Sequence, residues 1–175
     1  LNIVHGAGAT VGAALAKHSQ VNLLSFTGSS ATGKQMMIAA GQSNMKRLLL
    51  ECGGKSPFIV FEDCPEDLDF IAAEVVAAAF RNQGELCVAG TRLLIHENIK
   101  DKLLPKVIAQ AAQLVPGDPL DPNTTFGALI NEAQMNKVLA YIECGQREGA
   151  ELMLGGQRVD VDTGNGNSKG EGKNK

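Results

Sequence analysis

Aromatic residues are scarce in this chain of 175 residues, at 4%. Apolar residues still make up 44% of the sequence, so a packed core is possible and must be filled by alanine, valine, leucine and isoleucine. The formal net charge is only −3, which gives no electrostatic reason to expect a nucleic-acid partner. No unbroken apolar stretch approaches the roughly 18 residues that suggest a membrane-spanning helix. The length suits one domain or parts of two.

Cysteine and histidine are also few and scattered. The four cysteines, at positions 52, 64, 87 and 144, form no CxxC pair, so neither a structural zinc site nor another metal site is predicted. Their irregular spacing favours free thiols in a reducing compartment, and hence a cytoplasmic protein. The first residues lack the charged segment of a signal peptide. The chain starts at Leu1 rather than at methionine, so we expect that its natural N-terminus lies upstream.

Expected strands and helices alternate along most of the sequence. The strands are expected at residues 1–4, 21–26, 45–51, 58–61, 92–96 and 151–154. The helices are expected up to His18, over 34–40 with Gly41 as the stop, over 68–80, over 99–115, and from an Asn131 cap to Gly149. Such alternation indicates an α/β fold with largely parallel strands. Pro105 predicts either a kink or a later start in its helix.

Residues 163–175 differ in kind from the rest of the chain. They contain only threonine, glycine, asparagine, serine, lysine and glutamate. Because such a segment buries too little apolar surface to offset its ordering entropy, we expect a disordered tail.

Two glycine-containing turns are candidates for cofactor binding. Gly6, Gly8 and Gly12 fit a GxGxxxG pattern, which suits either a dinucleotide or a tight turn with close helix packing. The turn at residues 27–30 follows an expected strand and opens a helix. It suits either a phosphate at the helix N-terminus or an ordinary cap by Ser29 or Ser30.

The best candidates for covalent chemistry are one thiol and one carboxylate. Cys87 lies in a turn between Gly84 and Gly90, and Glu51 ends an apolar run just before two glycines. A thiol nucleophile and a carboxylate base form a recurring catalytic pair. From the residues alone, Cys87 is more typical of a small buried hydrophobic residue, and Glu51 of a surface charge at a strand end.

Three segments in sequence order decide between these interpretations. They are FTGSSATG at residues 26–33, LECGGKSP at residues 50–57 and FRNQGELCVAGTR at residues 80–92. Together they resemble the cofactor, glutamate and cysteine motifs of the aldehyde dehydrogenase superfamily, over roughly residues 1–155. Members of this family are much longer, so the resemblance implies that the chain is a piece of a longer enzyme.

The resemblance implies oxidation of an aldehyde to a carboxylic acid with NAD or NADP. Cys87 would be the nucleophile and Glu51 the base that activates water. Residues 1–52 would close a Rossmann-like cofactor domain, and residues 53–162 would open an α/β catalytic domain. The parent enzyme would be a homodimer or homotetramer without a nucleic-acid or membrane partner. The implied cofactor-binding residues are Phe26, Thr27, Gly28, Ser29, Gly33 and Cys52.

Some features depart from the family pattern. Glu85 stands where the family usually has glutamine, and Cys52 where it usually has leucine. The family's oxyanion-hole asparagine and cofactor-contacting lysine would lie upstream, and its second glutamate and oligomerisation hairpin downstream. Two alternatives stay open: an acylating relative that uses coenzyme A, and an inactive α/β interaction fragment. The presence of Glu51 argues against the first, and the presence of both Cys87 and Glu51 argues against the second.

Overall fold

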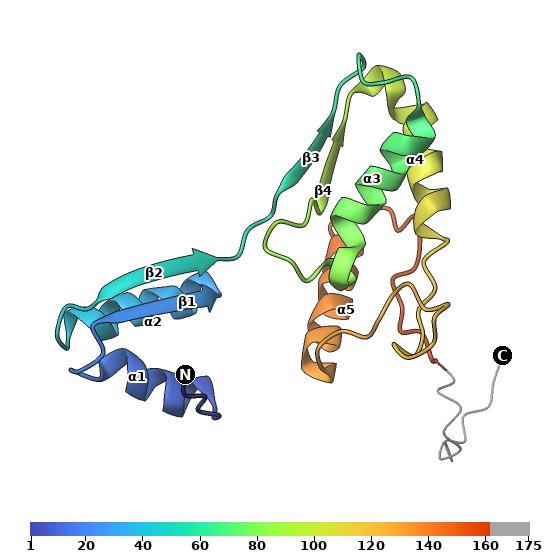
Figure 1. The fold of residues 1–175 in the computed structure, drawn as a ribbon. Coiled ribbons are helices and arrows are strands. Elements are labelled where there is room, and N and C mark those ends of the chain that lie inside the picture. Colours follow the sequence, from blue (N-terminus) through green and yellow to red (C-terminus); the bar gives the residue numbers. More distant parts are fainter. Residues whose placement is uncertain (162–175) are drawn as a thin grey trace. The chain divides into compact units, whose positions relative to one another are not determined.

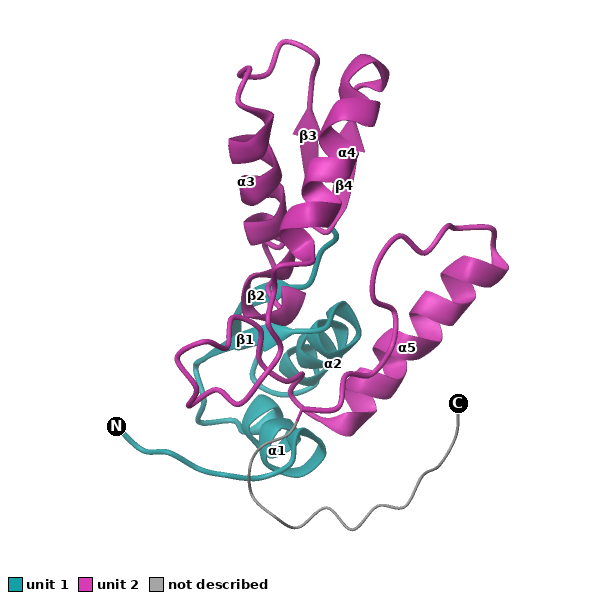
Figure 2. Cartoon of the chain, turned by 90° about the vertical axis from the view of Figure 1, so that its right-hand side faces the viewer, with its two compact units in different colours: residues 1–55 teal, residues 56–175 magenta. Residues whose placement is uncertain are grey.

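In a computed structural model that describes residues 1–161, the chain forms two compact units. The first comprises residues 1–55 and the second begins at Ser56 (Figures 1 and 2). The sequence predicts a domain boundary close by, after Cys52, and the identity of the two parts as cofactor and catalytic domains stays a prediction. The expected disordered tail lies outside the described residues.

The first unit is built on a β–α–β arrangement. A single π-helical turn, η1 (Gly8–Gly12), leads into α1 (Ala13–Lys17), and then β1 (Leu23–Gly28), α2 (Ser30–Gly41) and β2 (Arg47–Cys52) follow. The strands pair in parallel over their full length, and α2 packs against both of them. Ala39 and Ala40 are buried in this packing, which their small side chains allow at a close helix–sheet approach.

A buried lysine joins α1 to the turn that follows α2. The Lys46 side chain donates from Nζ to the carbonyl oxygen of Ala16 (2.6 Å) and to the hydroxyl oxygen of Ser43 (2.8 Å). The Asn44 amide donates to the carbonyl oxygen of Ser19 (2.7 Å). Because Ala16 lies in the last turn of α1, the ammonium group also meets the negative end of that helix dipole.

The second unit places helices against another parallel strand pair. It contains β3 (Pro57–Val60), α3 (Leu68–Phe80), the 3₁₀ turn η2 (Arg81–Gly84), β4 (Arg92–Ile95), α4 (Glu97–Ala111) and α5 (Glu132–Arg147). β3 pairs with β4, and α3 packs against α4 beside them (Figure 1). Its core consists of Val60, Ala72, Val75 and Leu103, around which partly buried apolar side chains pack.

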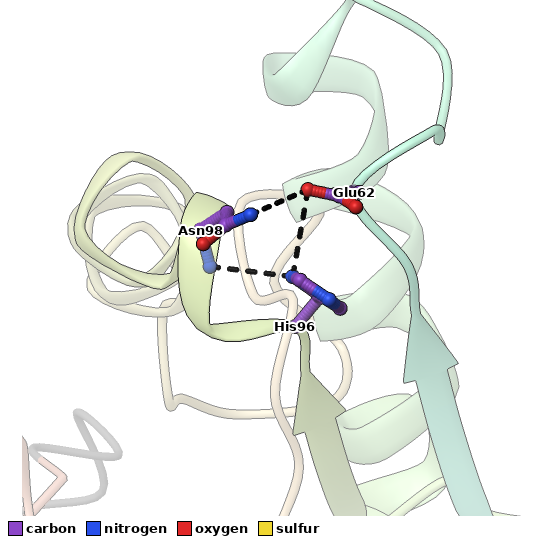
Figure 3. Close-up of polar contacts among 3 residues, drawn as sticks. All are labelled: Glu62, His96 and Asn98. Carbon is purple, nitrogen blue, oxygen red and sulfur yellow. Dashed lines mark hydrogen bonds and ion pairs between the residues drawn. The ribbon is translucent and has the colours of Figure 1, made fainter.

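Three polar residues connect the ends of β3 and β4 to the start of α4 (Figure 3). His96 caps the helix, because its Nδ1 accepts from the backbone N–H of Asn98 (3.3 Å). The Asn98 side chain donates to Glu62 Oε2 (2.6 Å), which lies 3.9 Å from His96 Nδ1. These contacts fix the first turn of α4 to the carboxyl end of the strand pair.

Most expected elements are confirmed to within a few residues, including all four central strands and the helices around residues 34–40, 68–80 and 131–149. The Gly149 stop is confirmed in detail. Gly149 has φ +95°, its N–H donates to the Gln146 carbonyl (3.0 Å), and the Ala150 N–H donates to the Gly145 carbonyl (2.9 Å). This pair of bonds is a Schellman motif.

Several local expectations are wrong. Residues 1–4 and 151–154 are not strands, because apolar runs form strands only where another strand accepts their backbone hydrogen bonds. Gly41 is expected to follow the end of its helix, but it is the last helical residue of α2, and Gln42 follows as the C-cap. A late start at Pro105 is also wrong, since the His96 cap begins α4 at Glu97 with the proline inside.

Candidate active site

The carboxyl edge of the β1–β2 pair gathers most of the predicted site residues. In the strand register, Thr27 lies opposite Glu51, and Gly28 lies opposite Cys52. The N–H of Gly53 donates to the carbonyl oxygen of Gly28 (3.2 Å), which extends the pairing beyond β2. Parallel strands end at the same edge of a sheet, so the predicted base and the predicted cofactor turn are neighbours. The Glu51 and Cys52 residues are exposed there.

The N-terminus of α2 opens at this same edge. Ser29, rather than Ser30, is the cap: its Oγ accepts from the backbone N–H of Thr32 (3.2 Å). Among residues 1–161, the backbone N–H groups of Ser30 and Ala31 have no acceptor. Two free N–H groups at the positive end of a 12-residue helix are suited to an anionic group such as a phosphate.

Two positions at this edge need glycine, because neighbouring side chains lie too close for an added Cβ atom. A Cβ atom on Gly28 would lie 2.5 Å from the ring of Phe26, so glycine leaves space for that half-buried ring. A Cβ atom on Gly33 would lie 3.2 Å from Cys52 Sγ and 3.9 Å from a methyl group of Leu50. The lack of a side chain on Gly33 therefore lets the first turn of α2 approach β2.

The predicted nucleophile lies in a loop that follows α3. Near its start, the loop has three residues whose backbone is in the left-handed conformation. Asn82, Gln83 and Gly84 have φ values of +50°, +58° and +71°. A Cβ atom on Gly84 would lie 3.0 Å from the carbonyl oxygen of Ala79, so both conformation and space require glycine there. The Asn82 carbonyl accepts from the N–H of Glu85 (3.0 Å) and closes the turn.

The other end of this loop is packed into the second unit. Ala89 is 5% exposed, and the N–H of Gly90 donates to the Ala78 carbonyl (3.0 Å). A Cβ atom on Gly90 would lie 3.3 Å from that of Phe58. Cys87 is exposed between these fixed points, so it is not a buried core residue. Its backbone N–H has no acceptor among the described residues.

Sequence reasoning did not single out Gln83, although it connects this loop to a distant segment. With its amide oriented by the hydrogen-bond network, Gln83 accepts from the N–H of Gly127 (2.9 Å) and donates to the carbonyl oxygen of Asn82 (3.2 Å). No local pattern indicates such a contact, because Gly127 lies far along the chain.

The predicted site residues are divided between the two units. Glu51 and all six predicted cofactor-binding residues belong to the first unit, and Cys87 belongs to the second. Of the other cysteines, Cys64 packs against the core of the second unit. Within residues 1–161, no group of three histidine, cysteine or acidic residues could hold a metal ion, and no helix is long and apolar enough to cross a membrane.

Comparison with known proteins gives a consistent result. Residues 1–169 match the model of the aldehyde dehydrogenase family. The NADP/NAD-dependent aldehyde dehydrogenase PuuC of Escherichia coli K12 is 47% identical over 161 residues, which cover 92% of this chain and 32% of the relative.

Solved structures of the family also match. The aldehyde dehydrogenase KauB of Pseudomonas aeruginosa has a TM-score of 0.86 and 55% identity, over 88% of this chain and 31% of that one. A variant of the P. syringae indole-3-acetaldehyde dehydrogenase AldA in complex with NAD⁺ and IAA has the same TM-score and coverage, with 52% identity. The chain thus spans about a third of the length of these relatives. With its parallel α/β units and the family match over residues 1–169, the chain belongs to the aldehyde dehydrogenase family.

Proposed function

We propose that this chain is a segment of an NAD(P)-dependent aldehyde dehydrogenase that oxidises an aldehyde to a carboxylic acid, with Cys87 as nucleophile and Glu51 as base. The observation that carries the proposal is the state of Cys87. It is exposed in a loop whose flanks are fixed, and its own N–H is free of any acceptor among the described residues. A thiol presented in this way can attack a substrate while its backbone stays in place.

The first step forms a bond between Sγ of Cys87, in its thiolate form, and the carbonyl carbon of the aldehyde. The attack turns the carbonyl oxygen into an alkoxide, and the free N–H of Cys87 is available to donate a hydrogen bond to it. Departure of a hydride from the same carbon then leaves a thioester on Cys87. When bound, NAD(P)⁺ supplies the acceptor for this hydride.

The second step releases the acid. Glu51 takes a proton from water while the water oxygen attacks the thioester carbon. The bond between carbon and Cys87 Sγ breaks, so that a carboxylic acid leaves and the thiolate is restored. The exposure of Glu51 at the end of β2 supports this role, because a base for water must be reachable by water.

The edge that carries Glu51 also suits the phosphates of NAD(P). The free N–H groups of Ser30 and Ala31 would bind a phosphate oxygen, and the turn of Thr27, Gly28 and Ser29 would lie beside it. The half-buried ring of Phe26 and the Gly33–Cys52 contact would support this turn from within the unit.

Assembly of the full-length enzyme as a homodimer or homotetramer, and its location in the cytoplasm, remain predictions.

The test uses the full-length enzyme, a panel of aldehydes and each of the two cofactors, with reduced nicotinamide and free acid as the two readouts. We expect equal amounts of both, and complete loss of both in Cys87→Ser. The matched control is Cys144→Ser, which changes a partly exposed thiol on α5 and should keep full activity. Product that appears only when coenzyme A is added would instead indicate the acylating alternative, and an inactive enzyme would contradict the proposal.

A further inference from the structure

The two ends of the Cys87 loop are held in different ways. The end nearer β4 is fixed by the protein interior, because Ala89 is buried and the N–H of Gly90 bonds to the carbonyl oxygen of Ala78. The end nearer α3 has no such packing: Asn82 is exposed and Gln83 is half-buried. Within residues 1–161, a hydrogen bond of the Gln83 side chain with Gly127 attaches this end to a segment distant in sequence.

The backbone at this end also needs an offsetting interaction. Asn82 and Gln83 are both left-handed, at φ +50° and +58°, which is unfavourable for residues with a side chain. The Gln83 amide offsets this cost at two points, because it donates to the Asn82 carbonyl oxygen (3.2 Å) and accepts from the Gly127 N–H (2.9 Å). One side chain therefore stabilises both the strained turn and its attachment.

The partner segment is shaped to receive this amide. A Cβ atom on Gly127 would lie 3.0 Å from the amide end of Gln83, so glycine provides the space. Close to Gly127 the segment is itself fixed, because the N–H groups of Thr125 and Phe126 both donate to the Val115 carbonyl oxygen (3.0 Å each). Gln83 thus binds a fixed backbone donor rather than a flexible side chain.

We propose that Gln83 is a positioning residue for the nucleophile, and that it holds the Cys87 loop in its reactive arrangement through the Gly127 backbone. This inference rests on the proposed function, since it matters only if Cys87 is the nucleophile. Without the amide, the turn at residues 82–84 is expected to relax toward right-handed conformations. Cys87 then spends less time in the arrangement that presents its thiol and N–H to a substrate.

The test measures the alkylation of individual thiols in the full-length enzyme by brief iodoacetamide treatment and mass mapping. Cys52 is the internal reference, because it is exposed like Cys87 but lies in the other unit. Cys64 reports on unfolding, because it is partly buried against the core and its alkylation should speed up if the unit opens. In Gln83→Ala we expect the ratio of the Cys87 rate to the Cys52 rate to fall about fivefold, the population bias that one hydrogen bond provides. Cys64 should stay protected, and kcat should fall while the KM for the cofactor is kept.

The matched control is Gln146→Ala, which removes an exposed glutamine from α5 and should leave the ratio unchanged. A ratio in Gln83→Ala within twofold of the wild-type value, with Cys64 protected, overturns the inference but leaves the proposed function intact. A wild-type ratio near one overturns both, since Cys87 would then not be an activated nucleophile.

A second variant decides the case in which Gln83→Ala exposes Cys64. Gln83→Glu keeps an oxygen that accepts from the Gly127 N–H, so most of the ratio should be retained. If Cys64 stays protected in this variant but the ratio still falls more than about fivefold, the contact with Gly127 does not position the loop and the inference is overturned.

Discussion

Gly33, in the first turn of α2, lies so close to Cys52, at the end of β2, that a Cβ atom on it would be 3.2 Å from Cys52 Sγ. This contact lies at the edge of the sheet where Glu51 and the predicted cofactor turn meet. The size of the side chain at position 52 therefore sets how closely the helix N-terminus can approach the strand.

The first prediction concerns this contact. Gly33→Ala gains helix propensity but must push Cys52 aside, and overpacking of this kind costs about 1–3 kcal/mol. We expect it to be less stable than Gly41→Ala, the matched control, since a Cβ atom on Gly41 would have nothing within 4 Å. Adding Cys52→Ala should relieve the crowding, so that the double variant loses less stability than the sum of the single variants. Urea unfolding of the wild type, Gly33→Ala, Cys52→Ala and the double variant measures this coupling. Strictly additive losses of stability would contradict it.

The second prediction concerns the buried lysine. Lys46→Met keeps a long side chain but removes the donors to the Ala16 carbonyl and to Ser43. Because a buried acceptor is left without a partner, we expect a loss of about 1–3 kcal/mol in the free energy of unfolding. Lys34→Met, at an exposed position of α2, is the control and should be nearly neutral. Equal unfolding curves for the two variants would show that the Lys46 contacts contribute nothing.

Local patterns in the sequence predict the helices and the central strands well, because their causes are local. The apolar spacing of α3 gives its buried side chains Ala72, Val75 and Val76, and the cap of α5 is formed by Asn131, which accepts from the Gln134 N–H (2.8 Å). The two expected strands that do not form depend on something that is not local. Whether residues 1–4 or 151–154 pair depends on another strand elsewhere, which their own composition does not reveal.

In the candidate site, too, some features follow from local sequence patterns and others depend on distant residues. Cys87 and Glu51 are found from the sequence because their glycine-rich contexts form recognisable motifs. The exposure of Cys87 and the free N–H groups at the start of α2 require the fold, since burial and hydrogen bonding depend on distant residues. The contact between Gln83 and Gly127 is of the same kind, because it joins two loops that no periodic pattern connects.

The third prediction concerns the base in the full-length enzyme. Glu51→Gln should leave the first turnover intact and slow the release of the acid, because only thioester hydrolysis needs the carboxylate. A burst of reduced cofactor followed by a steady state slower by a factor of about 10² or more is expected, and stopped-flow absorbance measures both phases. Glu74→Gln, at an exposed position of α3, serves as the control. Loss of the burst together with turnover would mean that Glu51 acts before the thioester forms.

The fourth prediction concerns the 175-residue chain by itself. Within residues 1–161, both sheets have only two strands, and each exposes large apolar side chains. Leu49 is 58% exposed on β2, Ile59 is 54% exposed on β3 and Leu94 is 51% exposed on β4. Open strand edges and uncovered apolar faces promote association. We therefore expect the isolated chain to self-associate, and to bind NAD far more weakly than the full-length enzyme.

Light scattering and calorimetric titration with NAD test this prediction directly. If the sheet faces cause the association, Ile59→Thr combined with Leu94→Thr should reduce the scattering, because threonine keeps a strand-forming side chain but lowers the apolar area. Tyr141→Thr is the control: it removes a side chain that is 71% exposed, but on α5 rather than on a sheet, so it should leave the scattering unchanged. A monodisperse monomer that binds NAD with an affinity in the micromolar range would show instead that these faces need no cover. The chain would then be a self-sufficient domain, and the proposal that it is a segment of a longer enzyme would be wrong.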